Sequence, residues 1–228
     1  MPTLDHLVVM AASLEQGVAW CEATLGVTPV PGGEHPLMGT HNRLLKIATA
    51  DFSQAYLEII AVNPDAGLGD SAVCSVSPAR WFDMDETALR ERVQRDGPQL
   101  IHWVAAVDDI TATVTALAAQ NIDRGKILQA SRQTPSGLLQ WQISVRPDGQ
   151  RLFDGCLPTL IQWGDTHPTH TMPGSGVTLH SLHLRHPKAD ALRRALVTTG
   201  LTAIAVTDGP ARISATLQTP KGLIEIHT

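Results

Sequence analysis

The sequence has few cysteines, little charge and no long apolar run. Only three cysteines occur in 228 residues, Cys21, Cys74 and Cys156, and no two form a CxxC pair. Such usage favours neither a disulfide framework nor a thiolate zinc site, and it suits a reducing compartment. No apolar run reaches the ~20 residues that a membrane span needs, and the N-terminus has no basic segment or cleavage site of a secretory signal. We therefore expect a cytoplasmic protein with no membrane partner.

Basic clusters and recognisable nucleophile motifs are also missing. The formal net charge is −5, and no run of Lys and Arg is interleaved with aromatic residues, so nucleic acid is not an expected partner. There is no GxSxG motif, no lysine within an apolar strand and no cysteine beside an evident base. A covalent nucleophile is therefore not part of the expected chemistry.

A repeated order of strands and helices is the strongest feature that is present. A strand-like run, an amphipathic helix and about three further strands follow one another three times. We expect an α+β fold of three βαβββ units, in which paired curved sheets form a cleft. The predicted parts are a first unit (1–63), a linker and connecting helix (64–97), a second unit (98–165), a linker (166–176) and a third unit (177–228).

Helix signals are clearest in the first unit. Ser13 stands before an apolar-periodic segment with Gln16 three residues later, which is a capping-box pattern, and Gly26 is placed as a C-terminal stop. Ser77 and Pro78 favour the start of the connecting helix, which we expect to be interrupted near Asp83.

Each unit carries one histidine in its first strand and one carboxylate or amide in its last strand. The histidines are His6 in "LDHLVV", His102 in "LIHWVA" and His183 in "SLHLRH". The carboxylates and the amide are Glu58 in "YLEII", Gln162 in "LIQWG" and Glu225 in "LIEIH". A carboxylate in an apolar strand costs free energy unless it is paired, protonated or bound to a metal.

Strand alternation predicts that these side chains share one face of the sheet. Leu57 and Ile59 would pack on the helix, which turns Glu58 to the other face together with His6, and the same parity is expected for His102 and Gln162. Such a set suits Zn²⁺, Mn²⁺, Fe²⁺, Co²⁺ or Ni²⁺. A single strand histidine is more often a hydrogen-bonded structural residue, and an amide is a weaker metal ligand than a carboxylate. A metal-free cleft therefore stays open as an alternative.

Further ligand-binding candidates lie in loops and on a strand of the second unit. His35 and Asn42 belong to the glycine-rich stretch "GGEHPLMGTHN", which is either a cleft edge or an ordinary turn. Arg80 could meet an acidic substrate from the connecting helix. On the strand "GLLQWQISV" we expect Gln140 or Gln142 to face the cleft, because Trp141 shares the parity of the apolar Leu139 and Ile143.

These features together resemble the vicinal oxygen chelate superfamily, which includes glyoxalase I, extradiol dioxygenases and metal-free bleomycin-resistance-type binders. The stretches "HPLMGTHNRLLKI", "YLEIIAVNP", "FDGCLPTLIQWG" and "TPKG" are similar to bacterial glyoxalase-like-domain proteins over essentially the whole chain. The resemblance implies a cleft between paired units, with His6, Glu58, His102 and Gln162 at its metal or ligand positions.

Two functions follow as expectations from this resemblance. The first is a metal-dependent lyase, isomerase or dioxygenase acting on a small oxygen-rich metabolite, with Glu58 as the base. The second is a metal-free binding or resistance protein that holds a small molecule in the same cleft. Two units suffice for one cleft, so the third either covers the others or pairs with another chain, as in a homodimer.

Overall fold

The computed structural model describes residues 1–66, 79–134 and 137–228, and three segments of it share the predicted element order. The first contains β1 (Thr3–Met10), α1 (Leu14–Leu25), β2 (Val30–His35), β3 (Thr40–Lys46) and β4 (Tyr56–Val62). The second contains β5 (Gln99–Ala106), α3 (Ile110–Ala118), β6 (Lys126–Thr134), β7 (Gly137–Val145) and β8 (Thr159–Trp163). The third contains β9 (Thr178–Arg185), α4 (Ala189–Thr198), β10 (Ala205–Thr207), β11 (Arg212–Thr219) and β12 (Gly222–His227).

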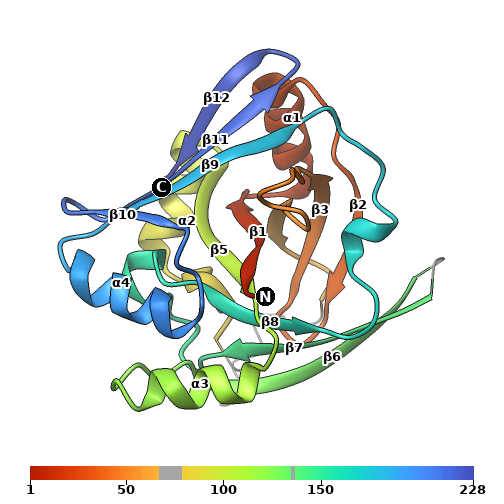
Figure 1. Ribbon diagram of the computed structural model, residues 1–228. Helices are drawn as coiled ribbons and strands as arrows, with labels where there is room; N and C mark the ends of the chain where they lie inside the picture. Colours follow the sequence, from red (N-terminus) through yellow and green to blue (C-terminus); the bar gives the residue numbers. More distant parts are fainter. Residues whose placement is uncertain (67–78, 135–136) are drawn as a thin grey trace.

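The first two segments form one strongly curved sheet. Its strand order is β2-β3-β4-β1-β5-β8-β7-β6, and the antiparallel pairing of β1 with β5 joins the two halves. In each half the first strand pairs in parallel with the last. The sheet curls into a partly closed barrel with β2 and β6 at its two edges (Figure 1). This confirms the α+β fold with curved sheets, although the two sheets are continuous.

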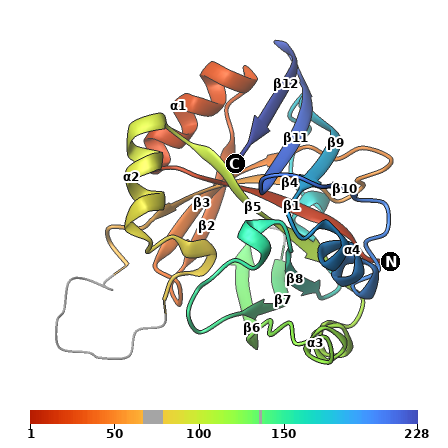
Figure 2. The same ribbon diagram turned by 90° about the vertical axis from the view of Figure 1, so that its left-hand side faces the viewer.

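The third segment has the same element order but a different strand order. Its strands run β10-β9-β11-β12, so the first strand lies between the second and the third. His183 on β9 and Glu225 on β12 are consequently not on neighbouring strands, so the third segment does not repeat the pairing of His6 with Glu58. This small sheet packs over the outer face of the large one, where β11 and β12 pass close to β5 (Figure 2). The third segment therefore covers the first two.

The local signals of α1 are confirmed. Ser13 accepts a hydrogen bond from the Gln16 amide, and Gly26 ends the helix in the left-handed region at φ 78°. The Gln16 side chain accepts from the Ala12 amide, one residue before the cap. This satisfies amide groups that the first helical turn leaves without partners.

The connecting segment is broken, as expected near Asp83. A short 3₁₀ helix, η1 (Trp81–Asp83), precedes α2 (Thr87–Asp96), and Phe82 and Asp83 have φ values of 61° and 58°. The predicted start at Ser77 and Pro78 lies outside the described residues. Two further 3₁₀ helices are η2 (Phe153–Gly155) and η3 (Pro168–His170). None of the helices in residues 1–66, 79–134 and 137–228 is long and apolar enough to cross a membrane.

The large sheet has an apolar core on each face. On the outer face, Leu57, Ile59 and Leu160 pack with α1, α3, α4 and the small sheet. The inner face is apolar around Val8, Ile60 and other residues that include Trp81, Phe82, Met84, Leu89 and Val93, so η1 and α2 cover part of it. The polar candidates lie on this half-covered inner face.

Close packing of α1 on β4 generates a stability prediction. Gly17 is buried, and a Cβ at this position would overlap Ile59 Cγ2. Gly17→Ala should gain about 1 kcal/mol of helix propensity but lose more through overpacking. We expect a net loss of about 1–2 kcal/mol in the free energy of unfolding, measured by urea denaturation.

The control places the same substitution in an Ile59→Ala background. Removing the overlapping methyl group should abolish most of the Gly17→Ala penalty, because the two residues are in contact. A stabilised single variant, or an unchanged penalty in the double variant, would contradict this account.

Candidate functional site

His6 and Glu58 meet on the inner face of the sheet. They lie on the paired strands β1 and β4 (Figure 2), and His6 Nε2 is 3.6 Å from Glu58 Oε2. Both side chains are almost fully buried. Asn42 Nδ2 donates to Glu58 Oε1 at 2.6 Å, while Asn42 Oδ1 accepts from the Gly33 amide at 2.7 Å. Asn42 therefore fixes one carboxylate oxygen and leaves the other facing His6.

Asp5 holds His6 from the opposite side of the imidazole. His6 Nδ1 lies 2.6 Å from Asp5 Oδ1, and Asp5 Oδ2 accepts from Trp163 Nε1 at 2.8 Å and from His167 Nε2 at 3.0 Å. Burial alone would raise the pKa of Asp5, but hydrogen bonds from His167 and His6 outweigh it and lower the pKa to about 2. An ionised Asp5 keeps a proton on His6 Nδ1 and aims Nε2 at Glu58.

The two side chains line a small chamber with aromatic walls. Its volume is about 50 Å³. A wider apolar groove of about 500 Å³ lies at its mouth and shares His35, Trp81, Arg132, Trp141 and Ile143 with it. The full chamber lining is His6, His35, Asn42, Leu44, Tyr56, Glu58, Trp81, Phe82, Arg132, Leu139, Trp141, Ile143, Ile161, Trp163 and Pro168. The chamber admits a small polar group, and the groove could accept an apolar extension.

Two chamber residues complete its electrostatics. Tyr56 stacks on His6 with ring centroids 4.6 Å apart, and burial raises the pKa of its hydroxyl well above the usual range. Burial also lowers the pKa of His35, whose Nδ1 lies 3.0 Å from Thr40 Oγ1. Both shifts favour the neutral side chains, so neither Tyr56 nor His35 adds charge to the chamber near pH 7.

His102 does not join the chamber. It is 1% exposed; Nδ1 lies 3.0 Å from the Gly155 carbonyl oxygen, and Nε2 is bonded by the amide and hydroxyl of Thr159. Burial lowers the pKa of His102 well below its usual range. With both ring nitrogens occupied by protein groups, His102 is a structural histidine in this geometry.

Gln162 lies on the opposite face of the sheet from Glu58. Its Oε1 accepts from the Ile110 amide at the start of α3. The parallel registers pair Val8 with Glu58 in the first half and Val104 with Thr159 in the second, so Thr159 is the counterpart of Glu58. The sequence comparison was offset by three residues, and an odd offset reverses which face a strand residue occupies.

Of the four predicted ligand-binding residues, two line the chamber and two lie elsewhere. His35 and Asn42 line the chamber, and their role in binding a ligand stays a prediction. Gln140 lies on the outer side of β7, in a shallow surface depression with Gln129 and Gln142, because Trp141 contributes to the inner aromatic wall instead. Arg80 is paired with Asp85 and is not among the residues that line the chamber.

Sequence reasoning missed three polar residues that shape the site. Asp5 precedes His6 in a strand whose register with β5 shifts between Leu4 and His6, so simple alternation would have turned it away. His167 sits in the predicted linker, yet it is 2% exposed. Arg132 comes from the edge strand β6. Two of these three come from distant segments, so only the tertiary fold identifies them.

Comparison with known proteins follows from this geometry. Residues 4–200 match the family model described as a glyoxalase-like domain. The chain belongs to this family of glyoxalase-like domains. No curated protein matches significantly.

Solved structures are similar to the chain at low sequence identity. A hypothetical protein from Staphylococcus aureus is 14% identical, with a TM-score of 0.54 over 100% of this chain and 85% of that chain. Methylmalonyl-CoA epimerase from Streptomyces coelicolor, in complex with 2-nitronate-propionyl-CoA, is 14% identical, with a TM-score of 0.43 over 73% of this chain and 99% of that one. The epimerase from Mycobacterium tuberculosis is 14% identical, with a TM-score of 0.38 over 75% and 92%.

The resemblance seen in the sequence implies a divalent metal, so the donor set has to be tested against one. Within residues 1–66, 79–134 and 137–228, no three His, Cys, Asp or Glu side chains converge in a way that could hold a metal ion. Of the four predicted ligands, which all lie in the described part of the chain, only His6 and Glu58 face each other. His102 and Gln162 are bonded to other protein groups. These residues do not fit a resident ion with a full set of protein ligands.

The buried Asp5 carboxylate predicts a specific acid sensitivity. Its pKa falls from 3.8 to about 2 on folding, which corresponds to about 2 kcal/mol of stabilisation. Because the folded pKa is the lower one, this stabilisation is present above pH about 4 and is lost as the pH falls toward 2. Asp5→Asn should lose it at pH 6 and flatten the acid limb, measured as urea midpoints from pH 2 to 6.

Asp165→Asn is the matched control, since Asp165 is exposed. Its midpoints should follow the wild-type profile throughout. If the Asp5→Asn midpoints ran parallel to the wild-type midpoints, Asp5 would not be the source of this pH-dependent stabilisation.

Proposed function

We propose that this protein is a small-molecule isomerase or lyase in which Glu58 and His6 transfer a proton next to a carbonyl group. One observation carries the proposal: a carboxylate oxygen and an imidazole nitrogen face each other across a small chamber at 3.6 Å. The remaining positions of both groups are fixed by Asn42 and Asp5. General acid–base catalysis needs such a positioned and oriented pair.

The two facing atoms have complementary chemistry. The Glu58 carboxylate oxygen can accept a proton, and the His6 imidazole nitrogen can accept or donate one. Glu58 Oε2 can take a proton from a substrate carbon, and the electron pair moves onto the adjacent carbonyl oxygen as an enolate. Return of the proton to another carbon or face completes an isomerisation.

Arg132 supports an acidic carbonyl compound as the substrate class. Its guanidinium lies against Gly33 at the mouth of the chamber, and no acidic side chain pairs with it in the described part of the chain. A cation at this position favours a carboxylate or an enolate oxygen in the chamber. The aromatic walls would then hold the carbon skeleton.

Two alternatives compete with this proposal. A metal-dependent lyase, isomerase or dioxygenase would use the same His6–Glu58 pair with water or substrate completing the coordination. A binding or resistance protein would hold a ligand in the chamber and groove without catalysing a reaction. The small volume of the chamber suits a compact ligand in that case. A homodimer and a cytoplasmic location remain predictions beside all three.

Exchange of a substrate proton tests the proposal without knowledge of the full reaction. Small carboxylic acids bearing a ketone or aldehyde are incubated in D₂O, and loss of the C–H signal beside the carbonyl is followed by NMR. The wild type should accelerate exchange for at least one compound. Glu58→Gln should reduce the rate roughly 10²–10⁴-fold, because the amide keeps the bond from Asn42 but cannot accept the proton.

Glu225→Gln is the control, because Glu225 lies exposed on β12 of the small sheet. Its exchange rate should equal the wild-type rate, and both variants should keep the wild-type melting temperature. Binding of a compound without any exchange would favour the binding protein, and equal rates in wild type and Glu58→Gln would remove Glu58 as the base.

Elemental analysis of protein purified without a histidine tag distinguishes the metal-dependent alternative from the proposed metal-free reaction. Because the described donors supply only two facing atoms, we expect no stoichiometric Zn, Mn, Fe, Co or Ni and no rise in melting temperature on adding these ions. Stoichiometric metal that is lost in Glu58→Gln but retained in Glu225→Gln would establish the metal-dependent alternative instead.

A further inference from the structure

Arg124 is a buried cation with almost no hydrogen bonds. It precedes β6 and is 3% exposed. Among the described residues, its one hydrogen bond runs from Nη2 to Thr159 Oγ1 at 3.3 Å, and its buried Nε has no partner. No carboxylate lies within ion-pair distance of it in residues 1–66, 79–134 and 137–228. A guanidinium has five N–H donors, and burying such a charge without an acceptor costs several kcal/mol.

The charge of Arg124 is not removed by its surroundings. Burial, together with the charge of Arg146, lowers the pKa of Arg124 to about 10, so the group stays protonated at neutral pH. Arg146 is itself paired with Asp148, and its Nη1 lies 3.7 Å from Asp123. Asp123 is largely exposed and solvated, so it compensates Arg124 only from a distance.

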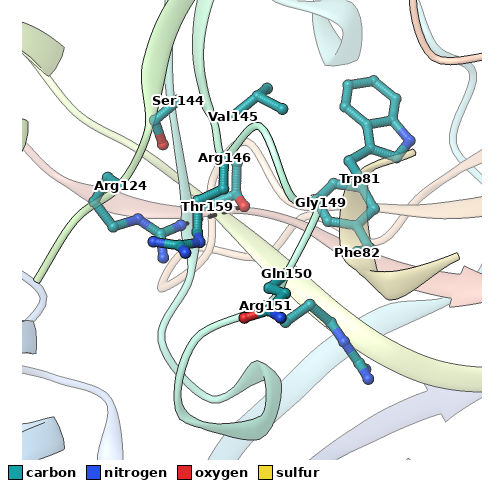
Figure 3. A pocket seen from close by; sticks show the side chains of 10 residues that line it. All are labelled: Trp81, Phe82, Arg124, Ser144, Val145, Arg146, Gly149, Gln150, Arg151 and Thr159. Carbon is teal, nitrogen blue, oxygen red and sulfur yellow. Dashed lines mark hydrogen bonds between the residues drawn. The ribbon is translucent and has the colours of Figure 1, made fainter. Parts of the chain in front are cut away.

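A very small cavity lies beside this guanidinium. Figure 3 shows Arg124 reaching toward Thr159 at one wall, with Trp81 and Phe82 on the other side. Its volume is about 10 Å³, which is room for about one water-sized particle. Arg151 also borders it, but its side chain is turned away and is bound to Asp83 and the Ile101 carbonyl.

A second donor is available at the same cavity. Ser144 is 2% exposed, and its oxygen accepts from the Leu160 amide at 3.2 Å. The hydroxyl hydrogen has no acceptor among the described residues and is free to donate. The cavity thus offers a fixed positive charge and a hydroxyl donor, and no carboxylate among its lining residues.

We propose that Arg124, with Ser144, binds one monatomic anion of the chloride type in this cavity. The cavity favours an anion because it offers positive charge and unused donors and has no carboxylate in its lining. Its volume fits a single ion and is too small for the carboxylate or phosphate group of a larger ligand. The site is distinct from the His6–Glu58 chamber, from which Trp81 and Phe82 separate it, since these two side chains line both. It stands whether or not the proposed proton transfer is correct.

Bromide is the direct probe, because it replaces chloride and scatters anomalously. Crystals of the full chain grown in sodium bromide should show an anomalous peak beside Arg124. In solution, the melting temperature should rise in a saturable way, by about 2 °C or more, on titrating chloride or bromide into a chloride-free buffer. Sodium sulfate at matched ionic strength should give only the gradual, non-saturating rise of an excluded salt.

Arg124→Met should lose the saturable component, whereas Arg95→Met, at an exposed arginine of α2, should keep it. If Arg124→Met does not fold, Arg124→Lys replaces it in the experiment. Because the lysine retains the charge, its melting temperature should still rise in a saturable way with halide, but by less than in the wild type. An empty site in the bromide crystal, or the same halide response in wild type and Arg124→Met, would overturn the proposal.

Discussion

The candidate site depends on one buried carboxylate. Asp5 is fully buried. The free-energy cost of burying its carboxylate is offset by hydrogen bonds from three donors, His6, Trp163 and His167. These donors come from β1, from β8 at the far side of β5, and from the segment that leads to the small sheet. Asp5 thereby joins both halves of the large sheet and the chain leading out of it. The orientation of His6 toward Glu58 is a consequence of that arrangement.

Sequence patterns predicted the fold well because its elements carry local signals. Ser13, Gly26 and the strand alternation around Glu58 each depend on a few neighbouring residues, and the structure agrees with them. The third segment shows the limit of such signals. Its element order was read correctly, but strand order is set by which apolar faces are buried together, and no residue within β9 or β12 encodes that locally.

The sequence predicted the placement of the candidate side chains in the first half of the sheet but not in the second. His6 and Glu58 follow the alternation and meet. In the second half, the register of β5 with β1 shifts between Val8 and Val9, and the polar residue of β8 that matches Glu58 is Thr159, three positions before Gln162. His102 therefore bonds to Thr159 and not to a carboxylate, and the second half of the expected metal site is a hydrogen-bonded core next to Arg124.

The cleft of this fold is divided by two aromatic residues. Trp81 and Phe82 stack at 5.1 Å and line both the His6–Glu58 chamber and the cavity beside Arg124. Phe82 and Asp83 hold left-handed backbone conformations that bulky residues rarely adopt. The ion pair of Asp83 with Arg151, at 2.8 Å, holds this turn in place. The two rings therefore set the size of a ligand that can reach Glu58, and they keep the two cations Arg124 and Arg132 in separate compartments.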